Sequence, residues 1–311
     1  MRNITLRATY SVLCIVEHKT DGATGEHDDL LDIIRERLGL REFRDTANEA
    51  RRFLNLARPA LAPLQRSVRP AVQRGSREAA RRLFAISQPT EGTLVELYLS
   101  RRGITDLQHG SSLRYQPRCY YHGPHEESPA EIWPAMIACV TDLDGTTTGV
   151  HRTWLDPDGF DSNRLGKARI DTPRRAMGDL LGNAVRFGGV DDALVAGEGI
   201  ETMLSLRCVL PTMPMVAALS ANHLAALLLP LSLRRLYIAC DTDAAGMGAA
   251  TALTSCAGEV GIEAFPLSPR LGDFNEDLRT LGREELRAAM GVQLLPEDVA
   301  RFLPRAATDT G

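Results

Sequence analysis

The sequence contains very little lysine, few aromatic residues and no closely paired cysteines. Lys19 and Lys167 are the only lysines among its 36 lysine and arginine residues, and aromatic residues occupy 5% of its 311 positions. Either a GC-rich genome or selection for guanidinium groups that bind phosphate would produce this arginine bias. The 36 basic residues are outnumbered by 40 acidic ones, which gives a formal net charge of −4. This balance excludes a chain that is basic overall, but it permits a local basic groove.

Two further absences narrow the class of protein. The six cysteines are scattered without a CxxC pair, so we expect no disulfide framework. No apolar run reaches the roughly 18 residues that a membrane-spanning helix needs, so we expect no membrane association. These features together predict a cytoplasmic protein.

The first 82 residues carry one helical pattern and one arginine-rich segment. Residues 28–39 (DDLLDIIRERLG) place apolar residues at helical spacing and end at a glycine, which predicts a helix. Residues 51–82 are rich in arginine, interrupted by prolines, and contain a single acidic residue, Glu78. This segment is either an Arg-rich linker or a loose helix with a cationic face. It either contacts nucleic-acid phosphates or is simply solvated.

The middle of the chain alternates between apolar and cationic segments. Residues 91–102 (EGTLVELYLSRR) predict a helix, and residues 135–155 predict a β-hairpin with Asp144 and Gly145 in its turn. A cationic loop follows at 163–175. Such loops are usually only solvated surface, but this one directly precedes the most informative part of the sequence.

From residue 190 onward, short apolar strands alternate with helices. Strands are predicted at 193–197, 213–219, 233–240 and 263–268, and helices at 198–210, 221–230, 247–260 and 284–291. This alternation is typical of βαβ units, so we predict an α/β fold with a parallel sheet covered by helices on both faces. Functional groups in such sheets gather at the carboxyl ends of the strands.

Carboxylates follow two of these strands. Glu198 comes directly after the first, and Asp241 and Asp243 come directly after the third. Parallel neighbours would bring the three side chains together, and their mutual repulsion would require a cation. Carboxylate oxygen ligands favour Mg²⁺, with Mn²⁺ as a substitute. The simpler alternative is helix capping, which Asp243 could provide. Gly199 and Gly246, at the starts of the following helices, fit the approach of a phosphate.

The segments VAGEGIETMLSL (195–206) and YIACDTDAAGMGAA (237–250) together resemble the Toprim domain. This domain is found in bacterial primases, type IA and type II topoisomerases, old-family nucleases and RecR-type recombination proteins. The resemblance implies catalytic and metal-binding roles for Glu198, Asp241 and Asp243, and it offers Asp273 as a further metal ligand. The primase form usually has an aspartate four residues after its glutamate. This chain has Thr202 there, with Glu201 as a candidate substitute.

The flanking residues are similar to those of bacterial primases and of the primase-like Toprim proteins of plasmids and mobile elements. Basic residues of the corresponding segment line the path of template and nucleotide in primases. The resemblance therefore implies that Arg152, Lys167 and Arg169 contact phosphates of nucleic acid or nucleotide.

An amino-terminal zinc module, frequent in these relatives, is not expected here. Cys14 and His18 form one candidate ligand pair without enough partners, and Cys119, His122 and His125 form a second incomplete group. We therefore expect no zinc and read the start of the chain as the remnant of such a module.

Three functions remain open. The first is a Mg²⁺-dependent, primase-like nucleotidyltransferase, a DNA-directed RNA polymerase making primers on single-stranded DNA from nucleoside triphosphates, in replication of a plasmid or mobile element. Its partners would be that DNA, the nucleotides and, as an option, a replicative helicase. The second is a Toprim-type DNA nuclease, and the third is a non-catalytic binding or recruitment module of RecR type. A topoisomerase is not expected, because none of the six tyrosines lies in a suitable setting.

These patterns divide the chain into five parts. They are a module remnant (1–50), an Arg-rich linker (51–82), a smaller α+β primase-like subdomain (83–190), a Toprim domain with a four-stranded parallel sheet (191–291), and a tail (292–311).

Overall fold

The computed structural model describes residues 76–105, 112–123, 129–160, 164–189, 191–240 and 244–303, and two short strands near the amino terminus. Those strands, β1 (Lys19–Thr20) and β2 (His27–Asp28), pair antiparallel within a first unit, residues 1–73. The rest of the predicted helix at 28–39 lies outside the described residues. The arginine-rich stretch up to residue 75 and the side chains of Cys14 and His18 lie outside them as well.

The second unit, residues 74–311, contains the remaining elements. Its helices are α4 (Arg77–Ile86), α5 (Leu94–Ser100), α6 (Ile200–Arg207), α7 (Ala221–Ala225), α8 (Ala244–Glu259), α9 (Phe274–Thr280), α10 (Arg283–Gln293) and α11 (Pro296–Phe302). Its strands are β3 (Leu113–Tyr121), β4 (Glu131–Thr141), β5 (Thr147–Trp154), β6 (Arg174–Gly178), β7 (Ala184–Phe187), β8 (Ala193–Gly197), β9 (Met215–Ala217), β10 (Arg235–Ala239) and β11 (Glu263–Leu267).

These strands form one continuous sheet with two halves of different character. The order is β11-β10-β8-β9-β7-β4-β5-β6, and β3 also pairs with β4. The four strands β11, β10, β8 and β9 are mutually parallel, whereas β7 joins β9 antiparallel and leads into the antiparallel half. The predicted α/β class with four parallel strands is therefore confirmed.

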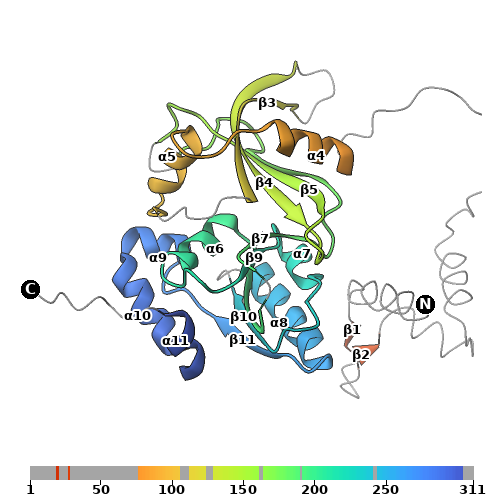
Figure 1. Ribbon diagram of the computed structural model, residues 1–311, viewed down its shortest axis with the longest axis vertical. Helices are drawn as coiled ribbons and strands as arrows, with labels where there is room; N and C mark the ends of the chain where they lie inside the picture. Colours follow the sequence, from red (N-terminus) through yellow and green to blue (C-terminus); the bar gives the residue numbers. More distant parts are fainter. Residues whose placement is uncertain are drawn as a thin grey trace, which may run out of the picture. The chain divides into compact units, whose positions relative to one another are not determined.

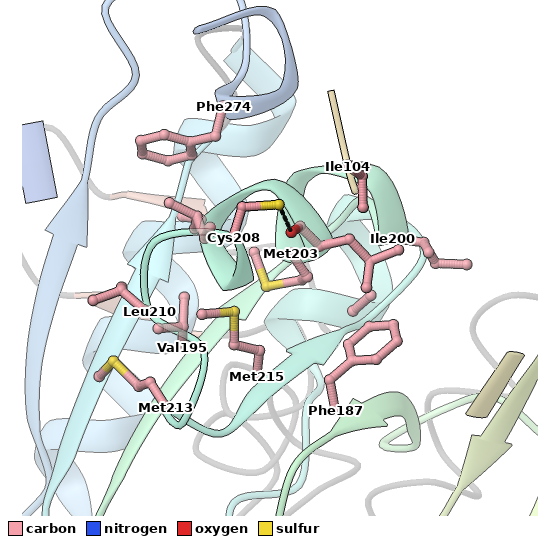
Figure 2. Packing of buried hydrophobic residues seen from close by; sticks show 14 of the residues in the cluster. Ile104, Phe187, Val195, Ile200, Met203, Cys208, Leu210, Met213, Met215 and Phe274 are labelled. Carbon is pink, nitrogen blue, oxygen red and sulfur yellow. Dashed lines mark hydrogen bonds between the residues drawn. The ribbon is translucent and has the colours of Figure 1, made fainter. Parts of the chain in front are cut away.

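Helices cover both faces of the parallel half. The apolar residues of α6, α9, α10 and α11 pack into one large core cluster, and those of α7 and α8 pack into a second. Figure 2 shows the first cluster around α6, where Met203 and Met215 lie against each other and Cys208 donates a hydrogen bond to the carbonyl of Leu204. Because residues of β8 and β10 are buried almost throughout, these strands consist of nearly continuous apolar residues, as sheets covered on both faces require.

The antiparallel half follows the predicted hairpin. β4 and β5 pair from Ala135 to Thr147, and Gly145 adopts a φ of +79° in the connecting turn. A left-handed φ is readily adopted by glycine, which explains the Asp-Gly dipeptide at this position. Helix α4 lies on these strands (Figure 1), and a third apolar cluster fills the space between them. Helix α5 instead contributes to the first cluster, which therefore connects the two halves.

Two segments beyond the predicted bounds of the two subdomains form helices. Residues 77–82 form the first part of α4, which agrees with the helical alternative for the arginine-rich segment; Ser76 caps this helix, and its residue Ala80 is buried. Residues 296–302, assigned to the tail, form α11, which starts with Pro296 and buries Phe302. In the part of the chain that the structure describes, none of the helices combines the length and apolar character needed to cross a lipid bilayer.

Helix α11 is held by a buried ion pair. Asp298 is completely buried, accepts two hydrogen bonds from Arg235 at 2.8 and 3.0 Å, and accepts one from the Tyr237 hydroxyl at 2.7 Å. The Asp298→Asn substitution removes the charge from this arrangement, so we expect it to lower the free energy of unfolding by about 2 kcal/mol, measured by urea denaturation. Glu297 also pairs with Arg235 but is exposed. The control Glu297→Gln should cost less than about 0.5 kcal/mol; equal losses in the two variants would contradict this account.

Candidate active site

The carboxyl end of β8 carries the first predicted catalytic residue. Glu198 follows Gly197 directly and is half-buried. Its carbonyl accepts a hydrogen bond from the Leu219 amide at 2.9 Å, and Leu219 has a φ of +78°. A branched side chain seldom adopts this conformation, and such strain is typical of functional loops. The strands β8 and β9 therefore hold the backbone of Glu198 in place.

The glycines around Glu198 lie in tight space. A β-carbon on Gly197 would lie 2.6 Å from the Met203 side chain, and one on Gly199 would lie 2.9 Å from the Thr202 hydroxyl oxygen. Gly199 is also the N-cap of α6. The hydroxyl of Thr202 therefore lies close to the start of α6.

The second predicted pair of carboxylates follows the neighbouring strand. β10 pairs in parallel with β8, with Ala239 opposite Gly197. Asp241 and Asp243 themselves lie outside the described residues, so their side chains are not located relative to Glu198. Cys240, the last described residue before them, donates its amide to the carbonyl of Leu267 at 3.1 Å. The same edge of the sheet thus carries the ends of β8, β10 and β11.

Asp273 lies beyond the end of β11. It caps helix α9, and its carboxylate accepts the Glu276 amide at 2.7 Å. This contact gives Asp273 a structural role without testing its predicted role as a metal ligand. Among the described residues, no three histidine, cysteine, aspartate or glutamate side chains are grouped as a metal site. Because this search leaves out residues 241–243, it does not bear on the predicted site.

Glu201 occupies the interface between the two halves of the sheet. It is 7% exposed, accepts the hydroxyl of Tyr98 in α5 at 2.5 Å, and lies 3.9 Å from the guanidinium of Arg174 in β6. Burial alone raises the pKa of this carboxyl, but the charges of Arg174 and Arg102 and the hydrogen bond from Tyr98 outweigh it and lower the pKa to about 2. Glu201 is therefore ionised at neutral pH.

Basic groups surround Glu201, and we call Arg102, His151, Lys167 and Arg174 the basic cluster. Burial and the charge of Arg174 lower the pKa of Lys167 to about 8, while Glu201 and Asp273 act in the opposite direction. Burial is also the main cause that lowers the pKa of His151 to about 4, so this imidazole is neutral at pH 7. The cluster carries three cationic side chains against the one buried carboxylate of Glu201.

Arg102 connects α5 to the helices behind the site. Its guanidinium donates to Asn275 Oδ1 at 3.0 Å and lies 4.7 Å from the centre of the Tyr98 ring. Asn275 in turn donates to the Arg102 carbonyl and to Ser205 Oγ, both at 3.0 Å. The Nε and Nη2 atoms of Arg102 and the Nδ1 of His151 are buried and make no hydrogen bond within the described residues. The cluster thus retains unused donors.

The structure separates the three predicted phosphate-binding residues. Lys167 belongs to the basic cluster, on a segment that pairs with Leu155 at the end of β5. Arg169 is exposed and lies 3.9 Å from Asp156. Arg152 lies on the other side of the strand, because it alternates with His151 and its guanidinium stacks 4.8 Å from the centre of the Trp154 ring. Arg152 is therefore not part of the basic cluster.

Sequence reasoning missed most members of this arrangement. Tyr98 and Arg102 are four residues apart at the end of α5, and this spacing predicts that their side chains are neighbours. Nothing local in the sequence indicates that they meet Glu201 and Asn275. Of the second candidate zinc group, Cys119 is buried in the apolar cluster under α4 and His122 is exposed, while His125 lies outside the described residues.

Two family models match the chain, one over the antiparallel half of the sheet and one over the parallel half. Residues 193–284 match the Toprim domain family, and residues 74–187 match a domain of unknown function, DUF7146. No curated protein matches the chain.

Similar solved structures include three primases. A crystal structure of the Aquifex aeolicus primase, with its zinc-binding and RNA polymerase domains, is 15% identical, with a TM-score of 0.48, covering 96% of this chain and 86% of that one. A DNA primase domain from Pseudomonas aeruginosa is 13% identical, with a TM-score of 0.48 and coverage of 70% and 78%. The RNA polymerase domain of the Mycobacterium tuberculosis primase is 13% identical, with a TM-score of 0.42 and coverage of 69% and 79%.

Proposed function

We propose that this chain, a Toprim-domain protein, is a primase-like nucleotidyltransferase that synthesises primers on single-stranded DNA. One observation carries the proposal: the Toprim match at 193–284 includes Glu198 and the aspartates after β10, and Glu198 lies at the carboxyl end of a strand that pairs in parallel with β10. The smaller subdomain up to residue 190 and the Toprim domain from 191 are part of this proposal. They are supported by the separate matches at 74–187 and 193–284.

The residues at this edge fit a divalent metal of the magnesium type. Asp241 and Asp243 would hold it with Glu198, and Asp273 is a further candidate, so all of the proposed ligands are carboxylate oxygens. Bound Mg²⁺ would supply charge neutralisation for the reacting phosphates. Glu198, fixed through its backbone by Leu219, would either complete the metal site or move a proton.

The basic cluster would bind the phosphates of the incoming nucleotide. Lys167 supports this role because it is half-buried and close enough to Asp273, a candidate metal ligand, for the two charges to interact. Arg174 adds a second, more exposed cation, and Arg169 remains a candidate on the same loop. The template would be single-stranded DNA, and we infer a role in replication of a plasmid or mobile element, with a replicative helicase as a candidate partner.

Lys167 gives a direct test of nucleotide binding. We expect Lys167→Met to raise the KM for nucleoside triphosphate about tenfold, because one charged contact to phosphate is worth about 1.4 kcal/mol. Lys167→Arg should restore part of the affinity. Steady-state kinetics over a range of nucleotide concentrations measures both. An unchanged KM in Lys167→Met would remove this residue from the proposed site.

The reaction itself is tested by following the length of the nucleic acid. The protein is incubated with single-stranded DNA, labelled ribonucleotides and Mg²⁺ or Mn²⁺, and the products are separated by size. New short labelled products are expected. Metal-dependent shortening of the DNA without such products would instead identify a nuclease, and DNA binding with neither product would identify a binding module.

A further inference from the structure

A second basic surface lies in the antiparallel half of the sheet, and we call it the outer groove. It has a volume of about 430 Å³ and extends along β5 and the edge strand β6. Its lining consists of His122, Gly123, Arg152, Trp154, Arg175, Ala176, Met177, Gly178 and Leu180. The groove therefore combines two arginines and an exposed histidine with apolar side chains, and none of these lining residues is acidic.

The two arginines are direct neighbours across the strands. Arg152 of β5 is paired with Arg175 of β6 in the antiparallel register, and like charges in this position repel each other. Each guanidinium is held over an aromatic ring: Arg152 lies 4.8 Å from the centre of Trp154, and Arg175 lies 5.3 Å from the centre of Tyr121. Both positive charges are thus fixed side by side.

The two arginines differ in their hydrogen bonds. Arg175 donates to the carbonyl of His122 at 3.0 Å and to the Thr172 hydroxyl at 2.6 Å, which fixes its orientation. The Nε of Arg152 is buried and has no hydrogen-bond partner within the described residues. Burial is also the main cause of the lowered pKa of Arg152. Cys119 and Arg175, and no carboxylate of the described residues, act on the charge of Arg152. An anionic ligand in the groove would therefore offset the cost of partly burying this guanidinium.

The outer groove is separate from the basic cluster. Alternation along β5 puts His151 on the side of Glu201 and Arg152 on the other side of the sheet. Consistent with this, Glu201 acts on the pKa of His151, whereas Cys119 and Arg175 act on that of Arg152. A ligand in the outer groove would therefore not be the nucleotide at the Toprim edge.

We propose that the outer groove binds the phosphodiester backbone of single-stranded nucleic acid, with Arg152 and Arg175 contacting phosphates. An open groove along a strand suits a chain of phosphates, and guanidinium groups bind phosphate through paired donors. The apolar side chains of Met177 and Leu180 provide a surface for bases. This inference rests on the proposed function for the identity of the nucleic acid, and it adds a second contact region to it.

The test measures binding without catalysis. The affinity of a fluorescently labelled oligothymidylate is determined by anisotropy at several salt concentrations, in EDTA and without nucleotides. We expect Arg175→Gln and Arg152→Gln each to weaken binding about tenfold at 0.1 M salt, and each to reduce the slope of log K against log salt by about 0.7. The matched control is Arg234→Gln, an exposed arginine that directly precedes β10 and lies outside the groove lining, which should change neither quantity.

The outcomes separate this inference from the proposed function. If Arg175→Gln, which changes a side chain at the sheet edge, binds the oligonucleotide as tightly as the wild type does, the inference is overturned. The proposal of primer synthesis is not affected by that result. If binding depends on Arg175 but the protein makes no primers, the inference about the outer groove holds and only the proposed reaction is overturned. Displacement of the oligonucleotide by millimolar ATP, with ATP affinity also dependent on Arg175, would identify a nucleotide site and overturn the assignment to nucleic acid.

Discussion

Replacing Asp241 by asparagine should lower the rate of metal-dependent nucleotidyl transfer about 10³-fold or more. In the sequence, Asp241 comes two residues after β10, whose carboxyl end lies at the sheet edge that also carries Glu198. The substitution keeps the size of the side chain and removes the charge that we assign to metal binding. Interactions that stabilise charge in a transition state contribute about this factor to catalysis. Single-turnover primer synthesis, measured over a range of Mn²⁺ concentrations, gives the size of the loss.

A matched substitution controls for nonspecific effects. Asp144 lies in the turn of the β4–β5 hairpin, is exposed, and precedes Gly145. Asn-Gly forms this type of turn as well as Asp-Gly does, so Asp144→Asn should leave both activity and stability unchanged. An Asp241→Asn protein that retains full activity would contradict the assignment of Asp241 to the metal site.

Replacing Glu201 by glutamine should destabilise the fold by about 3 kcal/mol at neutral pH. The amide retains an acceptor for the Tyr98 hydroxyl, so the substitution removes mainly the charge that balances Arg174 and Arg102. Removal of one partner from a buried charged group typically costs about 3–5 kcal/mol. Urea denaturation of the wild type and the variant measures the difference.

The effect of Glu201 should depend on pH with a definite sign. The pKa of its carboxyl falls from an ordinary 4.5 to about 2 in the folded protein. Because the pKa is lower in the folded protein, the ionised carboxylate contributes its full share to the free energy of unfolding above about pH 4.5. This contribution is lost as the pH falls from about 4.5 to about 2. The stability difference between wild type and Glu201→Gln should therefore shrink over this range. A difference that stays constant from pH 7 to pH 3 would show that the carboxylate charge is not its cause.

Much of the parallel sheet could be predicted from the sequence because its strands are short, apolar and separated by clear helical patterns. Residues 193–197 form β8 with the predicted bounds, and the hairpin turn at Gly145 follows its dipeptide signal. Helix α11 was missed, although Pro296 followed by two acidic residues is a recognisable helix start. This local signal therefore predicts a helix in the segment that the domain division assigns to a tail.

The interface around Glu201 could not be predicted, because its contacts join distant parts of the chain. Tyr98 and Glu201 are 103 positions apart, and Arg102 and Asn275 are 173 apart. The sequence predicts that Arg152 and His151 lie on opposite faces of the sheet, because they are neighbours in a strand. Which of the two faces lies on the side of the Toprim residues follows only from the sheet order. The roles of Glu198, Asp241, Asp243 and Asp273 stay predictions.

The central claim is that a divalent metal binds at the sheet edge that carries Glu198. Its most direct test locates the metal by radical cleavage of the backbone. Fe²⁺ replaces Mg²⁺ in the protein, ascorbate and peroxide generate radicals at the bound iron, and mass spectrometry maps the backbone cuts. We predict cuts next to Glu198 and within residues 240–244, suppressed by excess Mg²⁺ and absent in Asp241→Asn. Cuts confined to other parts of the chain, or the same cuts in Asp241→Asn, would contradict a metal site at this edge of the sheet.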